Sequence, residues 1–332
     1  MLKNSNILIT GGTGSFGSSF VPLTLKKYKP KKIVIFSRDE MKQWEMSKKY
    51  ENDERVRFFL GDIRDQSRLS RALDGIDYVV HAAALKIVPT IEYNPFESIK
   101  TNVNGSVNLI EECINAGVKK VVSLSTDKAS NPINFYGTSK LVSDKLFISS
   151  NSYAGSKKTR FSVVRYGNVM GSRGSIIPYF ISLKETGLLP ITDTSMTRFM
   201  ISLEQAVDLV WHSFTDMAGG EIYVKKIPSM KVTDIAKAIA PRAKHRIIGI
   251  RPGEKIHEQM IGIEDAPYTY EYKDYYKIIP SVHPWTKSKF KIKNGKKVNK
   301  DFIYDSESNP QRMSIPSFRT WLKKNSKFIG II

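Results

Sequence analysis

The chain has 332 residues and a formal net charge of +20 at pH 7, from 52 Lys and Arg residues against 32 Asp and Glu residues. This length is enough to bury one large core or two modest ones. No apolar stretch approaches the roughly 20 residues that a bilayer requires, so we expect a soluble, cytoplasmic protein without a membrane partner. The single cysteine, Cys113, excludes an intrachain disulfide and is expected to be a buried thiol, and no ligand cluster predicts a metal site.

The positive charge invites a nucleic-acid hypothesis, but the basic residues are spread along the chain. Only residues 287–300 gather several lysines, and we interpret this segment as a solvated hairpin. We therefore expect no nucleic-acid partner. Polyanionic small ligands, a dinucleotide and a nucleotide sugar, would account for the positive charge equally well.

A glycine-rich turn joins the first predicted strand, residues 7–10, to a predicted helix over residues 18–27. Gly11, Gly14 and Gly17 have the spacing of a tight turn, a close approach of backbone to pyrophosphate, and close packing of helix on strand. The phosphate would then lie at the helix N-terminus. In this context the turn predicts a dinucleotide site rather than a plain structural turn.

The second predicted strand, residues 32–36, ends in hydrogen-bond donors instead of the acidic residue usual at an NAD site. Ser37, Arg38 and Lys42 offer donors and positive charge to a ribose 2′-phosphate, which predicts NADP. Asp39 works against this prediction if it pairs with Arg38 as a surface ion pair.

A third predicted strand, residues 57–60, is followed by Asp62 and Ile63. Asp62 is placed to accept a hydrogen bond from an adenine amino group while Ile63 packs on the ring. Alternatively, Asp62 caps the following helix, and both interpretations can hold together.

The fourth predicted strand, residues 78–81, leads into three small residues, Ala82, Ala83 and Ala84, which let a cofactor pass close to the backbone. Lys86 follows them. It points into the site or is a solvated loop lysine, and the sequence favours neither interpretation.

A β-branched run over residues 118–122 leads into Thr126, Asp127 and Lys128, which should lie where a buried parallel strand ends. Open α/β sheets bind their ligands at this edge. These three polar side chains are therefore candidate catalytic residues.

Tyr136 and Lys140 are four residues apart in a predicted helix over residues 136–149, so they share one helix face. A lysine ammonium there would lower the pKa of the tyrosine from about 10 towards neutrality and give a base for a sugar hydroxyl. A lone Tyr-x-x-x-Lys is more often an ordinary helical pair, so the rest of the chain has to decide.

Strands and helices alternate as far as a predicted strand over residues 161–165, which predicts an α/β fold with a Rossmann-like, doubly wound parallel sheet. Near residue 168 the pattern changes. We predict an NADP-binding domain over residues 1–167, with a returning segment at about 200–225, and a smaller mixed α/β nucleotide-sugar-binding domain over residues 168–332. The expected helices include 95–116, 176–184, 203–214 and 232–240, and the later strands 189–192, 221–224 and 246–250.

Loops of the second domain contain Arg198 and Arg251, which suit a diphosphate, and Glu254, which suits a ribose diol. Structural ion pairs explain the same three residues and, without further context, are the preferred interpretation.

Together these motifs resemble the extended short-chain dehydrogenase/reductase family of nucleotide-sugar enzymes, and more narrowly its inverting UDP-N-acetylglucosamine 4,6-dehydratases, which begin pseudaminic acid synthesis. The resemblance covers almost the whole chain, including Thr-Gly-Gly-Thr-Gly-Ser-Phe-Gly at 10–17, Ser-Thr-Asp-Lys at 125–128, Tyr-Gly-Thr-Ser-Lys at 136–140 and Arg-Pro-Gly-Glu-Lys at 251–255. Retaining dehydratases of the family carry glutamate in place of Lys128, and some capsule-synthesis relatives carry methionine in place of Tyr136. The chain departs from the pattern at Ile87 and matches it loosely over residues 268–300.

The resemblance implies a tightly bound, recycled NADP, UDP-N-acetylglucosamine as the small-molecule partner, and a homo-oligomer, either a hexamer or a dimer. It implies cofactor contacts from Gly11, Thr13, Gly14, Ser15, Phe16, Gly17, Ser37, Arg38, Lys42, Asp62, Ile63, Ala82, Ala83, Ala84, Tyr136, Lys140 and Val169. It implies substrate contacts from Lys86, Asn168, Arg173, Thr192, Arg198, Arg251 and Glu254.

The chemistry expected of such an enzyme assigns a role to each catalytic residue. A C-4 ketone makes the C-5 proton acidic enough for water to leave from C-6. Tyr136 is the expected base for the C-4 hydroxyl, supported by Lys140, while Thr126 donates to the C-4 oxygen. Lys128, as a free amine with a pKa depressed by Lys140 and the nicotinamide ring, removes the C-5 proton. Protonated Asp127 gives a proton to the departing oxygen.

Other functions stay open at this point. A retaining 4,6-dehydratase and a UDP-sugar C-4 epimerase use the same redox chemistry. A redox-sensing or nucleic-acid-binding protein on the same fold is the alternative outside enzymes, and the intact catalytic set argues against it.

Overall fold

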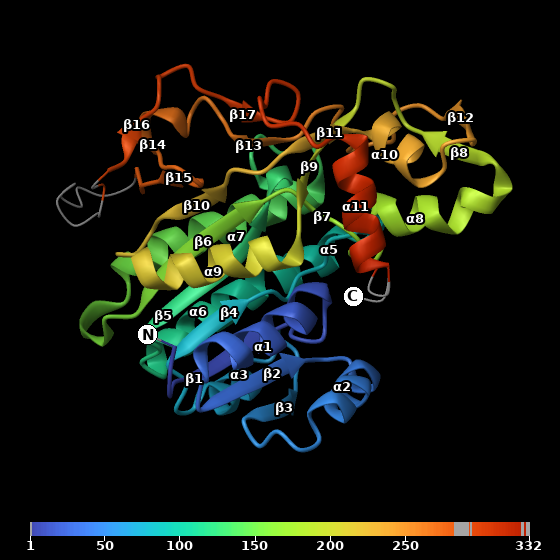
Figure 1. Cartoon of the computed structure of the whole chain (residues 1–332). Helices are drawn as coiled ribbons and strands as arrows, with labels where there is room; N and C mark the ends of the chain where they lie inside the picture. Colours follow the sequence, from blue (N-terminus) through green and yellow to red (C-terminus); the bar gives the residue numbers. More distant parts are fainter. Residues whose placement is uncertain (1, 282–291, 293, 327–328, 330–332) are drawn as a thin grey trace.

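A large, mostly parallel sheet forms the centre of the computed structural model, which describes residues 2–281, 292, 294–326 and 329 (Figure 1). The strand order is β16-β14-β15-β10-β6-β5-β4-β1-β2-β3. The parallel strands are β1 (Asn6–Thr10), β2 (Lys32–Ser37), β3 (Val56–Leu60), β4 (Tyr78–His81), β5 (Lys120–Thr126), β6 (Arg160–Tyr166) and β10 (Ile222–Lys225). This order reverses at β1, as in a doubly wound sheet, so the predicted fold class is confirmed.

Helices cover both faces of this sheet. α1 (Ser15–Tyr28) and α9 (Leu203–Asp216) pack together in front of it in Figure 1, while α3 (Gln66–Leu73), α6 (Gly105–Asn115) and α7 (Phe135–Ser149) pack on the other face. The strands are consequently apolar on both sides, as buried parallel strands must be: three consecutive residues of β1, Ile7, Leu8 and Ile9, are fully buried.

A smaller unit with its own core lies beyond the carboxyl ends of the parallel strands (Figure 1). Its strands are β7 (Asn168–Val169), β8 (Leu188–Ile191), β9 (Thr197–Ile201), β11 (Ser229–Lys231) and β12 (Lys244–Ile247), and its helices are α8 (Ile176–Leu183), α10 (Val232–Ile239) and α11 (Ile315–Asn325). Phe180, Ile235 and Phe318 meet in its core. A further pair, β13 (Gln259–Ile261) and β17 (Tyr304–Asp305), lies near its junction with the sheet.

The chain returns to the large sheet after residue 168. β10 is a strand of this sheet and α9 packs against it. The residues of these two elements lie close to the returning segment predicted at about 200–225. Three antiparallel strands that were not predicted extend the sheet beyond β10: β14 (Thr269–Glu271), β15 (Tyr275–Ile278) and β16 (Lys296–Lys297). Because strands from both halves of the chain share one sheet, the domain boundary at residues 167 and 168 stays a prediction.

The single long helix predicted over residues 95–116 is wrong in detail. The structure has α5 (Pro95–Ser98), then a π-helical segment η2 (Ile99–Asn104), then α6. Asn102 in η2 is buried; its Oδ1 accepts from Leu85 N at 2.8 Å and its Nδ2 donates to Leu85 O at 3.0 Å. The wider π-turn therefore supplies a side chain that holds the loop after β4 in place, an arrangement frequent at functional sites.

The remaining helices are short. They are α2 (Glu40–Ser47), α4 (Val88–Tyr93), and the 3₁₀ turns η1 (Lys48–Tyr50), η3 (Asp127–Ala129), η4 (Ser150–Ser152), η5 (Gly155–Lys157), η6 (Lys184–Thr186) and η7 (Ala266–Tyr268). Among the helices that the structure describes, none combines the length and the apolar composition needed to cross a membrane.

Two other sequence predictions can be placed. Cys113 is fully buried in α6, and burial raises the pKa of its thiol, as expected for a structural cysteine. Of the lysine-rich segment at 287–300, residues 287–291 and 293 lie outside the described residues. Lys296 and Lys297 form β16 and are exposed.

Candidate active site

The glycine turn between β1 and α1 is shaped for close backbone approach. Gly11 has φ of +65°, and a Cβ there would lie 2.8 Å from Ala83 Cα, so only glycine fits beside the loop after β4. A Cβ on Gly17 would lie 2.1 Å from Gly12 O. Gly14 is the N-cap of α1, and no described side chain caps this helix end. The turn therefore presents backbone N–H groups at a helix N-terminus, which fits the pyrophosphate of a dinucleotide.

At the end of β2, Ser37 is buried and engaged by a residue that the sequence analysis missed. Gln43 Nε2 donates to Ser37 Oγ at 3.0 Å and to Ser37 O at 2.9 Å. The Arg38 guanidinium is about half exposed and lies 3.7 Å from Asp62 Oδ2. Arg38 is thus held near the strand end by a weak, solvated ion pair and retains donors for a ligand.

The suggested pairing of Asp39 with Arg38 is wrong. Asp39 caps α2, accepting from Lys42 N at 3.0 Å, and its carboxylate forms an ion pair with the Lys42 ammonium. The Lys42 side chain lowers the pKa of Asp39. The charge of the Lys42 ammonium is therefore shared with Asp39, and its contact with a 2′-phosphate stays a prediction.

Asp62 does not cap the helix that follows it, so that alternative is also wrong. Asp65 is the cap of α3, because its Oδ1 accepts from Arg68 N at 2.9 Å. Asp62 instead pairs with Arg64, at 2.7 Å between Oδ2 and Nη2. Ile63 is buried, and a Cβ on Gly105 of α6 would lie 2.6 Å from its Cδ1. The adenine contacts of Asp62 and Ile63 stay predictions.

The loop after β4 runs beside the glycine turn between β1 and α1. Ala83 N donates to Thr10 Oγ1 at 3.3 Å. Lys86, further along, is exposed and donates to Arg173 O at 3.3 Å. Partial burial, followed by the charges of Arg173 and Lys128, lowers the pKa of the Lys86 ammonium. Lys86 and Arg173 therefore lie on the same basic side of the site as Lys128.

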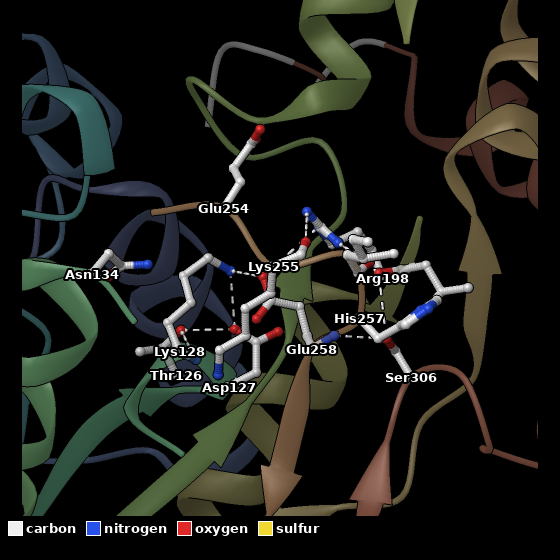
Figure 2. Close-up of polar contacts among 12 residues, drawn as sticks. Thr126, Asp127, Lys128, Asn134, Arg198, Glu254, Lys255, His257, Glu258 and Ser306 are labelled. Carbon is white, nitrogen blue, oxygen red and sulfur yellow. Dashed lines mark hydrogen bonds and ion pairs between the residues drawn. The ribbon is translucent and has the colours of Figure 1, made fainter. Parts of the chain in front are cut away.

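The catalytic candidates gather where β5 ends, as Figure 2 shows. Thr126 is the last residue of β5, and its Oγ1 donates to Asp127 Oδ1 at 3.0 Å. The Lys128 ammonium lies 3.1 Å from the same oxygen and 2.9 Å from Glu258 Oε1. Asp127 and Glu258 are each 1% exposed. Lys128 is thus flanked by two buried carboxyl groups.

α7 brings Tyr136 to this cluster. Asn134 caps the helix, accepting from Gly137 N at 2.7 Å, and the Tyr136 hydroxyl shares a hydrogen bond with Thr126. A Cβ on Gly137 would lie 2.2 Å from Lys128 O, so this glycine permits α7 to pack directly on η3. Lys140 is buried one turn further along the helix.

Two electrostatic expectations are wrong for the protein as described. Burial raises the pKa of Tyr136 to about 12, although Lys128 and Thr126 act to lower it. Burial favours the free amine of Lys128, but Asp127 and Glu258 outweigh burial and raise its pKa. A catalytic phenolate and a free amine therefore both depend on changes that accompany ligand binding.

One other expectation about charge, a raised pKa for Asp127, agrees with the structure in direction. Burial raises the pKa of Asp127, which favours the protonated carboxyl needed to donate a proton, and Glu258 adds to this effect while Lys128 opposes it. Burial lowers the pKa of Lys140, partly offset by Asp144.

The predicted substrate-binding residues fall into two groups. Arg198 in β9 is buried, and its guanidinium donates to the carbonyl oxygens of Ile256 at 2.9 Å and Lys255 at 3.0 Å. These contacts support the structural alternative for Arg198. Arg251 is 59% exposed and pairs with Glu254 at 2.8 Å. Both Arg251 and Glu254 therefore remain accessible to a ligand.

Three further candidates line the small unit. Asn168 and Val169 form β7, beside β9, and Thr192 is buried just after β8. The Oδ1 atom of Asn168 is buried and has no hydrogen-bond partner among the described residues. A buried acceptor of this kind fits a ligand-facing position.

Comparison with known proteins now identifies the family. Residues 7–280 match the family model described as "Polysaccharide biosynthesis protein". The chain belongs to this family. Its polysaccharide biosynthesis relatives include a UDP-N-acetylglucosamine 4,6-dehydratase (inverting) of Campylobacter jejuni subsp. jejuni serotype O:23/36 (strain 81-176), 55% identical over 318 residues, 94% of this chain and 95% of the relative. A UDP-glucose 4-epimerase of Rickettsia conorii is 40% identical over 330 residues, 97% of this chain and 96% of the relative.

Solved structures agree with the family assignment. Pen from Bacillus thuringiensis superimposes with a TM-score of 0.88 at 35% identity, covering 97% of this chain and 99% of that one. DesIV, a dTDP-glucose 4,6-dehydratase from Streptomyces venezuelae solved with NAD and TYD bound, gives a TM-score of 0.68 at 25% identity, covering 76% of this chain and 86% of that one. The resemblance to extended short-chain dehydrogenase/reductases that act on nucleotide sugars is therefore confirmed.

Glu258 is the main residue of this polysaccharide biosynthesis protein that sequence reasoning missed. It lies 130 positions from Lys128, beyond the reach of any local pattern. The only available signal was its place three residues after the Arg-Pro-Gly-Glu-Lys motif, on a segment already suspected of binding substrate.

Proposed function

We propose that the chain is an inverting UDP-N-acetylglucosamine 4,6-dehydratase. Its product would be the UDP-linked 2-acetamido-2,6-dideoxy-β-L-arabino-hexos-4-ulose. The observation that carries this proposal is the Asp127–Lys128 pair beside Thr126 and Tyr136 at the carboxyl end of β5. The 55% identical relative named as an inverting dehydratase supports it.

The residues of the glycine turn and the ends of β2 and β4 would hold a nicotinamide cofactor, which supplies hydride acceptance from C-4 and hydride return to C-6. Tyr136 takes the proton of the C-4 hydroxyl, and Thr126, within hydrogen-bond reach of Tyr136, donates to the C-4 oxygen. Buried Lys140 supplies positive charge on the same face of α7.

Elimination of water then uses Lys128 and Asp127. Lys128 takes the C-5 proton made acidic by the C-4 ketone, and Asp127, whose pKa burial raises towards the protonated form, gives a proton to the leaving C-6 oxygen as water departs. Acid and base thus come from neighbouring residues, and Lys128 must first lose the proton that Asp127 and Glu258 favour in the resting protein. Reprotonation of C-5 from the opposite face gives inversion.

Arg38 is the predicted determinant of NADP over NAD. Replacing it by alanine should weaken NADP binding by about 1.5–3 kcal/mol, the range for hydrogen bonds to charged groups, and leave NAD binding nearly unchanged. Arg55→Ala, which removes an arginine just before β3, at the amino end of the strand beside β2, is the matched control and should affect neither. Titration of both cofactors checks the result, and an equal loss for NADP and NAD would contradict the assignment.

Arg251 and Arg198 should respond differently to alanine substitution. Loss of exposed Arg251 should raise KM for the nucleotide sugar roughly 10–100-fold, as expected for a charged hydrogen bond, with little change in melting temperature. Loss of buried Arg198 should lower the melting temperature, because three backbone carbonyl groups each lose a donor. Steady-state kinetics and thermal melting test the pair. An Arg198→Ala variant that melts like the parent but binds substrate poorly would restore its predicted diphosphate role.

The function itself is tested by incubating the protein with UDP-N-acetylglucosamine and NADP and identifying the product by NMR. A 4-keto-6-deoxy sugar supports the proposal. A product that differs only in configuration at C-4 would instead favour the epimerase named among the 40% identical relatives.

A further inference from the structure

Glu258 is a buried carboxylate that the reaction scheme above does not use. Its Oε1 lies 2.9 Å from Lys128 Nζ and 3.8 Å from Arg198 Nε. Its Oε2 is buried and has no hydrogen-bond partner among the described residues. We propose that Glu258 is a positioning residue for the dehydration, an inference that rests on the proposed function: it holds the Lys128 side chain beside Asp127 and places a carboxylate opposite its ammonium.

The backbone around Glu258 is fixed on both sides, so its carboxylate is held in place. Glu258 N donates to Ser306 Oγ at 2.9 Å, and Ser306 N donates back to Glu258 O at 2.8 Å. Ser306 Oγ is in turn 2.7 Å from Thr197 Oγ1. The Arg198 guanidinium donates to the carbonyl oxygens of Ile256 and Lys255, just before His257 and Glu258 in the chain. Because its backbone is anchored in this way, the Glu258 side chain can determine the position of Lys128 rather than be positioned by it.

The segment that carries Glu258 also docks on the residues that follow β5. Asn134 Nδ2 donates to Gly253 O at 2.7 Å, and Lys255 Nζ donates to Ser130 O at 2.8 Å. A Cβ on Gly253 would lie 2.9 Å from Asn134 Cβ, so the two backbones approach closely here. The ion pair between Glu258 and Lys128 is the third interaction between this segment and the residues that follow β5 (Figure 2). The segment that holds the predicted substrate-binding residues therefore touches the catalytic residues directly.

Charged and titratable groups face Lys128 from several elements of the fold. They are Asp127 of η3, Tyr136 of α7, Arg198 of β9, Lys86 of the loop after β4, and Lys255 and Glu258 of the segment before β13. The cations and burial favour a neutral amine, and only the carboxyl groups oppose them. Burial raises the pKa of Asp127, whereas Lys128 and Arg198 outweigh burial and lower the pKa of Glu258. Of the two carboxyl groups, Glu258 is the one whose surroundings favour the charged form opposite Lys128.

The pH dependence of kcat/KM tests this role. Lys128 must lose its proton to act as the C-5 base, so the acid limb reports its ionisation in the free enzyme. Glu258→Gln should move that limb to lower pH by about one unit or more, a tenfold change in the ionisation constant. Glu258→Asp, which keeps the charge, should restore the limb towards that of the parent. Glu307→Gln makes the same change at a 68% exposed carboxylate 3.5 Å from His257 and should leave the limb in place. A Glu258→Gln limb that coincides with those of the parent and Glu307→Gln would overturn the proposal.

A second measurement needs neither substrate nor a folded Glu258 variant. In protein labelled with ¹³C at lysine Cε, with Lys128 assigned by comparison with Lys128→Arg, the proposal predicts that resting Lys128 titrates above the ordinary lysine value of about 10.4. Titration below that value would overturn it even if Glu258→Gln failed to fold. Absence of dehydration in the parent protein would count against the proposed function alone, since this titration does not depend on turnover.

Discussion

Replacing Lys128 by alanine should lower the rate of dehydration by about 10²–10⁴-fold, the usual contribution of a general base, while the first oxidation still proceeds. The physical reason is that Lys128 is the amine placed to take the C-5 proton, whereas the residues that act on C-4, Tyr136 and Thr126, are untouched. The reduced nicotinamide should then accumulate on the enzyme and absorb at about 340 nm. Stopped-flow absorbance and product NMR on the same sample measure both effects.

Lys100→Ala provides the matched control, because Lys100 is 58% exposed and pairs with Glu97 in a surface contact that should contribute little. Thermal melting must accompany the kinetics, since the Lys128→Ala variant leaves the buried Asp127 and Glu258 without their shared cation. A folded Lys128→Ala variant with undiminished turnover would contradict the assignment of the C-5 base.

Tyr136→Phe should give the opposite pattern, with loss of product by a similar about 10²–10⁴-fold and no accumulation of reduced nicotinamide. Without the phenolic oxygen, the C-4 hydroxyl has no base, so the reaction stops before the first hydride transfer. The ring remains, and the α7 cap at Asn134 is unaffected, so stability should change little. Single-turnover absorbance at about 340 nm measures the step directly.

Tyr153→Phe, at a tyrosine that is 73% exposed, is the matched control for removing a hydroxyl. If reduced cofactor accumulated in Tyr136→Phe as it does in Lys128→Ala, a group other than Tyr136 would be the base for the C-4 hydroxyl. The two variants together separate oxidation from elimination, which neither does alone.

The parts of the fold that follow from local patterns were predictable. The buried run before Thr126 and the glycine spacing at 11, 14 and 17 each encode a strand end or a turn within a few residues, and the structure places them at one sheet edge. Helix periodicity likewise placed Tyr136 and Lys140 on one face. The π-helical segment was not predictable in this way, because its apolar spacing resembles that of an ordinary helix and only the inward turn of Asn102 distinguishes it.

The electrostatics of the site were not predictable, because they depend on burial and on partners distant in sequence. Lys140 was expected to lower the pKa of Tyr136, but burial of the phenol dominates and raises it. Lys128 was expected to have a depressed pKa, but Asp127 beside it and Glu258, from a segment 130 residues away, together outweigh burial and raise it. Asp39 and Asp62 show a different limit at the cofactor end. Each carboxylate had several possible local roles, and the structure pairs Asp39 with Lys42 and Asp62 with Arg64.

The central claim is inversion at C-5 by a reaction in which Lys128 takes the proton, and the configuration of the product tests it most directly. Turnover of UDP-N-acetylglucosamine in D₂O, followed by NMR of the product before it epimerises in solution, should show the L-arabino 4-keto-6-deoxy sugar with deuterium at C-5. The returned proton comes from the opposite face and therefore from solvent. A D-xylo product would contradict the account and make the chain a retaining dehydratase.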